Sequence, residues 1–181
     1  MNEREFTETL LEKRKIYLYG DINEEYTEKI IKLLMFLDAK DEKKEITLYI
    51  NSTGGEVKSG IRLYRFIKKM INSPVKGIVI GSGDSMALVV LQACKKRMAL
   101  KESTFHLHHL RLEVKKEWDE FFEWAEKGIK SIKNVQEEIF SILTERNDKE
   151  KMEIIKKLTK EKALLKSDQA LELGLIDEII C

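Results

Sequence analysis

The sequence predicts an α/β fold built on parallel strands. Strand-like and helix-like segments alternate through the first half of the chain, which is the order that strand–helix–strand units require. Residues Val75–Ile80 form an almost continuous apolar run, as expected of a parallel strand covered on both faces. The next apolar segment, Met86–Cys94, has Gln92 as its only strongly polar residue, which predicts a helix buried on every side.

The elements before this run follow from periodicity and from their end signals. Residues 6–13 carry apolar side chains at helical spacing, and Lys15–Gly20 alternates and ends in glycine, as a strand does. Asn23 is a favourable N-cap for a helix whose broad apolar face runs to about Lys40. We therefore expect, in order, a helix over 6–13, a strand over 15–20, a helix over 23–40, a strand over 44–50, a loop over 51–55 and a helix over 56–70.

The second half of the chain predicts short strands and longer helices. The runs 96–100 and 104–109 are β-type, whereas residues 113–145 keep apolar side chains at helical spacing for most of their length. A helix that long in a chain this short is expected to project, with its apolar stripe covered by its own domain or by a neighbouring subunit. A helix over 148–160, a short helix over 167–173 ended by Gly174 and a strand over 175–180 complete the expected order.

Composition narrows the class of protein. A chain of 181 residues is expected to form one domain, spanning 1–181. Lysine and arginine number 33 against 32 acidic residues, so a net charge of +1 predicts no nucleic-acid or membrane-surface partner. No apolar run reaches the length of a membrane span. Cys94 falls in the buried helix and Cys181 is the last residue, so both are expected unpaired, in the cytoplasm.

The corner Gly81–Met86 joins the buried strand to the buried helix. Its glycines permit a sharp turn, and Ser85 comes at the first turn of the helix, where unpaired N–H groups face outward. That arrangement is typical of a nucleophile elbow. The alternative is that Asp84 or Ser85 only caps a core helix, which is common in α/β proteins.

Two other segments carry residues suited to chemistry. Asn51–Gly55 is a strand-to-helix connection whose N–H groups suit an anion or the oxyanion of acyl transfer, although a plain tight turn explains it equally well. All three histidines lie in one strand-like segment, His106–His109. Either one of them is a general base for a nucleophile, or a pair holds zinc; the second reading lacks clustered cysteine and acidic ligands nearby, so we expect no metal.

These motifs, taken together and in order, resemble the proteolytic subunit of the Clp (caseinolytic) protease family. The resemblance rests on Tyr49–Gly55, Gly81–Met86, Phe105–His108 and Glu172–Asp177, with Leu10–Ile16 near the start, and so covers nearly the whole chain. Each motif alone is weak, but four in order at matching intervals are specific.

The resemblance implies a fold, an assembly and a site. The fold would be the crotonase-type, Clp-protease-type spiral of β-β-α units, with a head over 1–109 and 163–181 and a handle over 110–162 that includes a projecting helix. The assembly would be a homo-oligomeric ring, usually a heptamer stacked in pairs, that hydrolyses peptides or unfolded proteins without a cofactor. It leaves open whether an AAA+ ATPase docks. Ser85 matches the nucleophile, His108 the base, and Gly55 with Met86 the oxyanion-hole donors.

The chain also departs from the family pattern. The position of the triad aspartate falls on Lys162, which cannot accept the histidine N–H, and the adjacent Glu161 is a weak substitute. The glycine-rich handle strand that binds extended substrate is replaced by Leu110–Lys116. An alternative is therefore a catalytically weak or inactive ring subunit. An acyl-CoA enzyme on the crotonase scaffold is a third reading, disfavoured because such enzymes seldom combine a serine elbow with a histidine strand.

Overall fold

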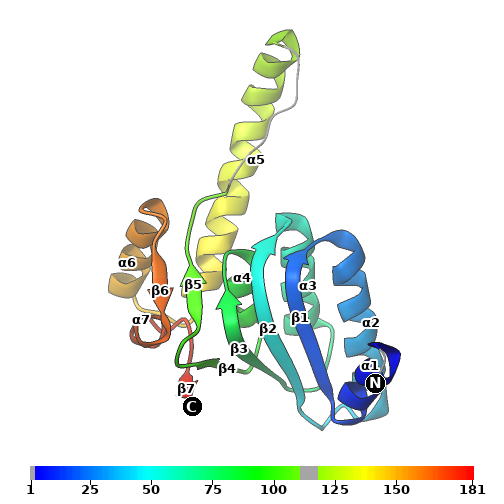
Figure 1. Ribbon diagram of the computed structural model, residues 1–181. Helices are drawn as coiled ribbons and strands as arrows, with labels where there is room; N and C mark the ends of the chain where they lie inside the picture. Colours follow the sequence, from blue (N-terminus) through cyan, green and yellow to red (C-terminus); the bar gives the residue numbers. More distant parts are fainter. Residues whose placement is uncertain (1–2, 111–117) are drawn as a thin grey trace.

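Five parallel strands form the main sheet of the molecule. The computed structural model describes residues 3–110 and 118–181, with side chains described for residues 5–110 and 128–181. The strands stand side by side in the order β1 (Lys15–Ile22), β2 (Ile46–Gly55), β3 (Val75–Gly83), β4 (Lys96–Leu100) and β7 (Glu178–Ile180), as Figure 1 shows. Every neighbouring pair in this order is parallel. The expected α/β architecture is confirmed.

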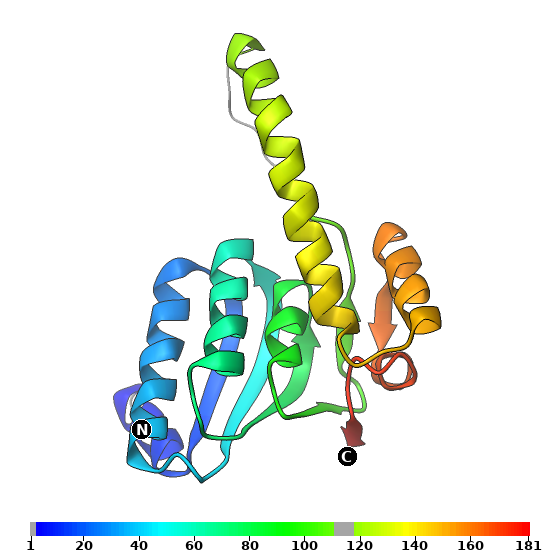
Figure 2. The same cartoon turned by 180° about the vertical axis from the view of Figure 1, so that it is seen from behind.

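Helices cover one face of this sheet (Figure 2). They are α2 (Glu24–Lys40), α3 (Val57–Lys69) and α4 (Met86–Gln92), while α1 (Glu3–Glu12) packs at the start of β1. Asn23 caps α2 as predicted, since its side chain accepts a hydrogen bond from the Tyr26 N–H at 2.9 Å. All seven residues of α4 are buried, which confirms the helix without a polar face.

A second, smaller set of strands lies at the end of β3. Strands β5 (Thr104–His106) and β6 (Leu164–Lys166) pair antiparallel, and β5 meets β3 through Ser82 and Thr104. Helix α7 (Ser167–Glu172) follows, and Gly174 ends that segment at φ +68°, the C-cap conformation expected of it. The sequence did not predict β6, because three residues are too short for a periodicity to show.

The strand expected over 175–180 begins only at Glu178, and two further boundaries that lie near the candidate site are also wrong. Residues 51–55 are not a loop but the end of β2, because β1 runs on to Ile22 and pairs with Gly55. The strand expected over 104–109 stops at His106, so His108 and His109 lie beyond it. Both shifts matter for function, because they place a glycine pair and a histidine at the same end of the sheet.

Helix α5 (Trp118–Thr144) projects from the head, as Figure 1 shows. Its C-terminal part is buried beside α4 through Ile139, Phe140, Ile142 and Leu143. Helix α6 (Lys149–Lys160) follows, with Asp148 as its N-cap. Residues 111–117, where the altered handle strand was expected, lie outside the described residues, as do the side chains of Trp118, Phe121, Phe122 and Trp124. Of the helices that are described, none has both the length and the apolar character of a membrane span.

An ion pair fixes β7 against β4. Arg97 is only 3% exposed, and its guanidinium binds the Asp177 carboxylate, which also accepts the Arg97 backbone N–H at 2.8 Å. Burial alone raises the pKa of Asp177, but the hydrogen bonds and charge of Arg97, with the charge of Arg146, outweigh it and hold that pKa below its ordinary value. This pair anchors the C-terminal strand to β4.

Candidate active site

Ser85 occupies a strained corner between β3 and α4. Its backbone has φ 50° and ψ −119°, which is unusual for a residue with a Cβ and is typical of a nucleophile elbow. The Ser85 N–H donates to the His106 carbonyl at 2.9 Å, and the Asp84 N–H donates to the Ser52 carbonyl at 3.0 Å. The corner is therefore tied to β2 on one side and to β5 on the other. Ser85 is the N-cap residue of α4 but makes no side-chain capping hydrogen bond, and the Asp84 carboxylate accepts the His106 N–H instead, so the alternative of a side-chain helix cap finds no support.

Two glycines at the end of β2 lie against this corner. A Cβ on Gly54 would come within 2.8 Å of the Ser85 Cβ and 2.9 Å of the Met86 nitrogen. Gly55 has φ +145°, and a Cβ there would meet the Ile22 carbonyl oxygen at 2.3 Å. Met86 is the first residue of α4, so no preceding helical turn can accept its N–H. Glycine is thus required at position 54 for β2 to approach Ser85 and Met86, and at position 55 for β2 to approach Ile22 of β1.

His108 lies two residues beyond the end of β5 and contributes its side chain to the site. The Leu107 N–H donates to the Ala163 carbonyl at 2.9 Å, which continues the pairing of β5 with β6 by one residue. The His108 Nδ1 lies 2.7 Å from the His109 carbonyl oxygen. A carbonyl oxygen can only accept, so Nδ1 carries the hydrogen of this contact. In the neutral ring that leaves Nε2 as the acceptor, which is the tautomer a general base needs.

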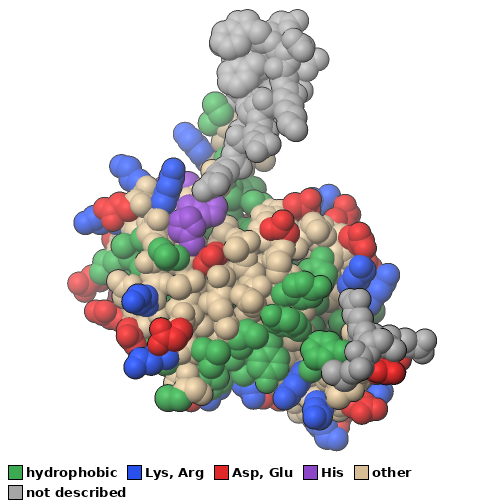
Figure 3. Space-filling view, in the orientation of Figure 1, with side chains coloured by type: hydrophobic (Ala, Val, Ile, Leu, Met, Phe, Trp, Pro, Cys, Tyr) green, Lys and Arg blue, Asp and Glu red, His purple; other side chains and the backbone are tan. Residues whose placement is uncertain are grey.

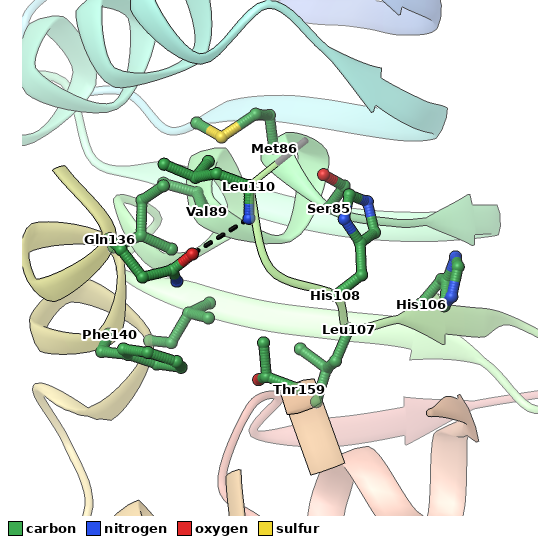
Figure 4. Close-up of a pocket in the computed structure, with 12 residues that line it drawn as sticks. Ser85, Met86, Val89, His106, Leu107, His108, Leu110, Gln136, Phe140 and Thr159 are labelled. Carbon is green, nitrogen blue, oxygen red and sulfur yellow. Dashed lines mark hydrogen bonds between the residues drawn. The ribbon is translucent and has the colours of Figure 1, made fainter. Parts of the chain in front are cut away.

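Ser85 and His108 line the same small cavity (Figure 4). The His108 side chain reaches toward Ser85 in this view, and the opposite wall comes from α5 and α6. Most of the remaining wall is apolar, formed by Val89, Leu107, Leu110, Ile139, Phe140 and Leu143. Gln136 accepts the Leu110 N–H at 3.0 Å and so ties the segment after His108 to α5. In the part of the chain that is described, the Ser85 hydroxyl makes no hydrogen bond to the His108 ring; catalytic contacts are often long before substrate binds.

Lys162 lies just before β6, the strand that pairs with β5. The register pairs Thr104 with Lys166, Phe105 with Leu165 and His106 with Leu164. The Leu107 N–H bond to the Ala163 carbonyl extends this pairing by one residue, and Lys162 is the next residue along the chain beyond it. Lys162 is exposed and left-handed, with φ 56°. Glu161 instead lies 4.0 Å from the Lys157 ammonium, so its carboxylate is directed along α6.

The three histidines separate into different environments. Figure 3 shows histidine side chains gathered in one place on this face. The rings of His106 and His108 are 5.2 Å apart, whereas His109 is exposed and contacts the Phe140 ring edge-on. Over the described ranges, no group of three or more histidine, cysteine, aspartate or glutamate side chains is placed to hold a metal ion.

Two features of the site were missed at the level of sequence. The Asp84 carboxylate accepts the His106 backbone N–H at 2.8 Å, and the His109 carbonyl holds the His108 ring. Both contacts depend on where β5 ends, which periodicity in a short run does not reveal. A charged residue immediately before the candidate nucleophile was the available signal for Asp84.

Comparison with known proteins decides the family. The family model described as Clp protease matches residues 2–181. The chain is also 34% identical over 173 residues to the ATP-dependent Clp protease proteolytic subunit of Ligilactobacillus salivarius (strain UCC118), covering 94% of this chain and 85% of the relative. The chain belongs to the Clp protease family. The resemblance stated from the motifs is thus confirmed, and the mixed α/β architecture agrees with the fold of the Clp proteases.

Membership of the Clp protease family indicates which class of activity the site residues should serve. It supports a serine peptidase of the Clp type, while the roles of individual residues are a separate question. It also leaves the acyl-CoA alternative without support.

Proposed function

We propose that the protein is a serine endopeptidase with Ser85 as nucleophile and His108 as general base. The observation that carries this proposal is the shared cavity: a serine on a strained corner and a histidine with Nδ1 already engaged both face it. The backbone N–H groups of Gly55 and Met86 are proposed as the oxyanion hole. Their support is the close approach of Gly54, the residue before Gly55, to Ser85 and the Met86 nitrogen at the start of α4.

The proposed chemistry follows from these positions. The Ser85 oxygen attacks the substrate carbonyl carbon while His108 Nε2 takes the hydroxyl proton. The carbonyl oxygen becomes an oxyanion and receives hydrogen bonds from the two N–H groups, each typically worth ~3 kcal/mol of barrier. The C–N bond then breaks, and the proton on Nε2 passes to the leaving amine. Water, activated by the same nitrogen, releases the acyl group from Ser85.

The third position of the triad is where this chain differs. Lys162, at the position where the family resemblance puts the triad aspartate, has a side chain that offers no acceptor and no negative charge. The His109 carbonyl orients the ring in its place, but a neutral dipole stabilises an imidazolium less than a carboxylate does. We therefore propose slow turnover. The same observation favours the second candidate, an inactive ring subunit that keeps the fold.

The proposed partners follow the family. The chain forms one domain with a projecting handle, assembles into a homo-oligomeric ring, a heptamer or stacked rings, and cleaves peptides or unfolded proteins inside it. Peptide hydrolysis without an ATPase is the activity proposed. A reducing, cytoplasmic location fits the two free cysteines. Burial raises the pKa of the Cys94 thiol to about 12, so that cysteine is inert to oxidation.

One experiment tests the proposal. Peptide hydrolysis is followed on a sample whose mass is measured by light scattering, with Ser85→Ala as the matched control. We expect a ring-sized particle that hydrolyses a fluorogenic peptide, and an equally large Ser85→Ala particle that does not. A ring without Ser85-dependent hydrolysis would favour the inactive subunit, and a folded monomer would contradict the assembly.

A further inference from the structure

The pairing of β2 with both of its neighbours becomes irregular near its C-terminal end. Toward β1, the register shifts between Tyr19 and Asp21. Toward β3, it shifts between Ile50 and Ser52. An irregularity of this kind leaves backbone N–H and C=O groups without their ladder partners. Such groups are costly when they are buried, so side chains have to supply the missing hydrogen bonds.

The Ser52 hydroxyl supplies two of these hydrogen bonds. Ser52 is only 2% exposed, and its Oγ donates to the Gly20 carbonyl of β1 and accepts the Gly54 N–H of β2 at 3.1 Å. The group of Gly20 that takes part is its carbonyl, which does not depend on the side chain at that position. The Ser52 backbone carbonyl in turn accepts the Asp84 N–H at 3.0 Å. Ser52 therefore joins β1, the glycine pair and the residue before the candidate nucleophile.

Gly54, which the Ser52 hydroxyl holds, lies directly against the candidate oxyanion hole. A Cβ on Gly54 would come within 2.9 Å of the Met86 nitrogen. Gly54 has φ +97°, and a glycine can leave such a conformation more easily than any other residue. The bond from its N–H to the Ser52 hydroxyl restricts this rotation. Because Gly55 is the next residue, the same bond determines where the Gly55 N–H points.

The backbone of Ser52 acts on the second proposed donor, the Met86 N–H. The Ala87 N–H donates to the Asp84 carbonyl at 2.9 Å, which closes the first turn of α4 around Met86. Since the Asp84 N–H is bonded to the Ser52 carbonyl, Ser52 limits the movement of this turn. Among the residues that the structure describes, none accepts the Met86 N–H, which is therefore available to an oxyanion.

We propose that Ser52 is a positioning residue that fixes the two donors of the oxyanion hole relative to each other. Its hydroxyl sets the Gly55 N–H through Gly54, and its carbonyl sets the Met86 N–H through Asp84. This inference rests on the proposed function, because it assigns a role to a residue behind the same site. Ser52 contacts no reacting atom and exchanges no proton during hydrolysis. Its effect arises because such donors act only at about 2.7–3.1 Å from the oxyanion.

The direct test is Ser52→Ala, which removes the hydroxyl and keeps the backbone carbonyl. We expect kcat for a peptide to fall about thirtyfold while KM changes less than about twofold, because the donors act on the transition state. A peptide aldehyde adds to the nucleophilic serine and places its oxygen in the hole, so its affinity should fall by a similar factor. Ser52→Thr, which keeps the hydroxyl, should retain kcat within about threefold of the parent.

Ser103 provides the matched control. It is 1% exposed, and its hydroxyl donates to the Val79 carbonyl of β3 at 3.0 Å. Ser103→Ala therefore deletes a buried serine hydroxyl outside the site and should change kcat and aldehyde affinity by less than about twofold. Equal losses in Ser52→Ala and Ser103→Ala would overturn the proposal, because they would show a general loosening of the core. Should Ser52→Ala fail to fold, Ser52→Cys takes its place, since a thiol fills the space but is a weak acceptor.

The two proposals fail in different ways. If a fluorophosphonate does not label Ser85 of the parent protein, the proposed function has failed, and the role of Ser52 fails with it. If Ser85 is labelled, unchanged kcat and aldehyde affinity in Ser52→Ala would overturn only the inference about Ser52. A loss confined to KM, or an equal loss of kcat in Ser52→Thr, would overturn it as well.

Discussion

The two walls of the cavity are built by different means. The nucleophile wall consists of Ser85 and Met86 with the end of β2 beside them. Here β2, β3 and α4 meet so closely that Gly54 has no space for a Cβ against Ser85 and Met86. On the histidine wall, which is the segment from Leu107 to Leu110 after β5, the Leu107 N–H donates to the Ala163 carbonyl and the Leu110 N–H donates to the Gln136 side-chain oxygen. The first wall is fixed by sterics along whole strands, and the second by a few hydrogen bonds.

This difference indicates where the site tolerates change. A change in the nucleophile wall must move backbone, which a close-packed core resists. A change in the histidine wall replaces a side chain at the surface, and Lys162 is such a change. A lysine at that exposed position is therefore compatible with the fold.

The largest expected effect distinguishes the role of His108 from that of His106. His108→Ala removes the proposed base and should lower peptide hydrolysis by about 10⁴-fold or more. His106→Ala should cost less than about tenfold, because it is the backbone of His106 that binds Ser85 and Asp84. Steady-state kinetics on both variants, with assembly checked by light scattering, make the comparison; a greater loss in His106→Ala would reverse the assignment.

The next effect tests the nucleophile wall. Gly54→Ala forces a methyl group against Ser85 and Met86 and should lower activity by about 10²–10³-fold, the usual effect of disturbing an oxyanion hole. Gly20→Ala is the matched control: Gly20 also has positive φ, at +65°, but nothing lies within 4 Å of its added Cβ. It should cost ~1 kcal/mol of stability and leave the rate nearly unchanged. Equal losses would show that backbone strain, not the wall, is responsible.

A smaller effect tests the histidine wall. Lys162→Asp should raise kcat/KM about tenfold, because it restores a carboxylate at the position where the family resemblance puts the triad aspartate. The left-handed backbone at 162 suits both aspartate and asparagine, so Lys162→Asn is a control without the charge. Glu161→Gln should change activity by less than about twofold, since Glu161 faces Lys157. No gain in Lys162→Asp would place the third member of the triad elsewhere.

The smallest effect on the rate of hydrolysis is expected for a substitution outside both walls, at Asp177. Asp177→Asn leaves the buried Arg97 charge without its partner and should lower stability by about 3–5 kcal/mol, with little change in activity per folded molecule. The folded pKa of Asp177 lies below its ordinary value, so its stabilising contribution is present above about pH 4 and is lost as the pH falls through the folded pKa. Denaturant unfolding at several pH values measures both; a pH-independent difference would contradict this account.

The nucleophile wall could be predicted from the sequence because the patterns that indicate it extend over many residues. A continuous apolar run, a glycine-punctuated corner and a helix without a polar face locate Ser85 and Met86 directly. The histidine wall could not, because β6 is three residues long and the end of β5 depends on tertiary pairing. Asp84 could be seen as charged but not as a partner of His106, since that contact joins residues 22 positions apart.

The account depends most on a reactive serine at position 85 served by the histidine at 108. The most direct measurement is labelling by a fluorophosphonate followed by peptide mass spectrometry, on the parent and on His108→Ala. The account predicts covalent modification confined to Ser85 and lost, or slowed by several orders of magnitude, in His108→Ala. Labelling at another residue, or labelling of Ser85 that does not depend on His108, would contradict it.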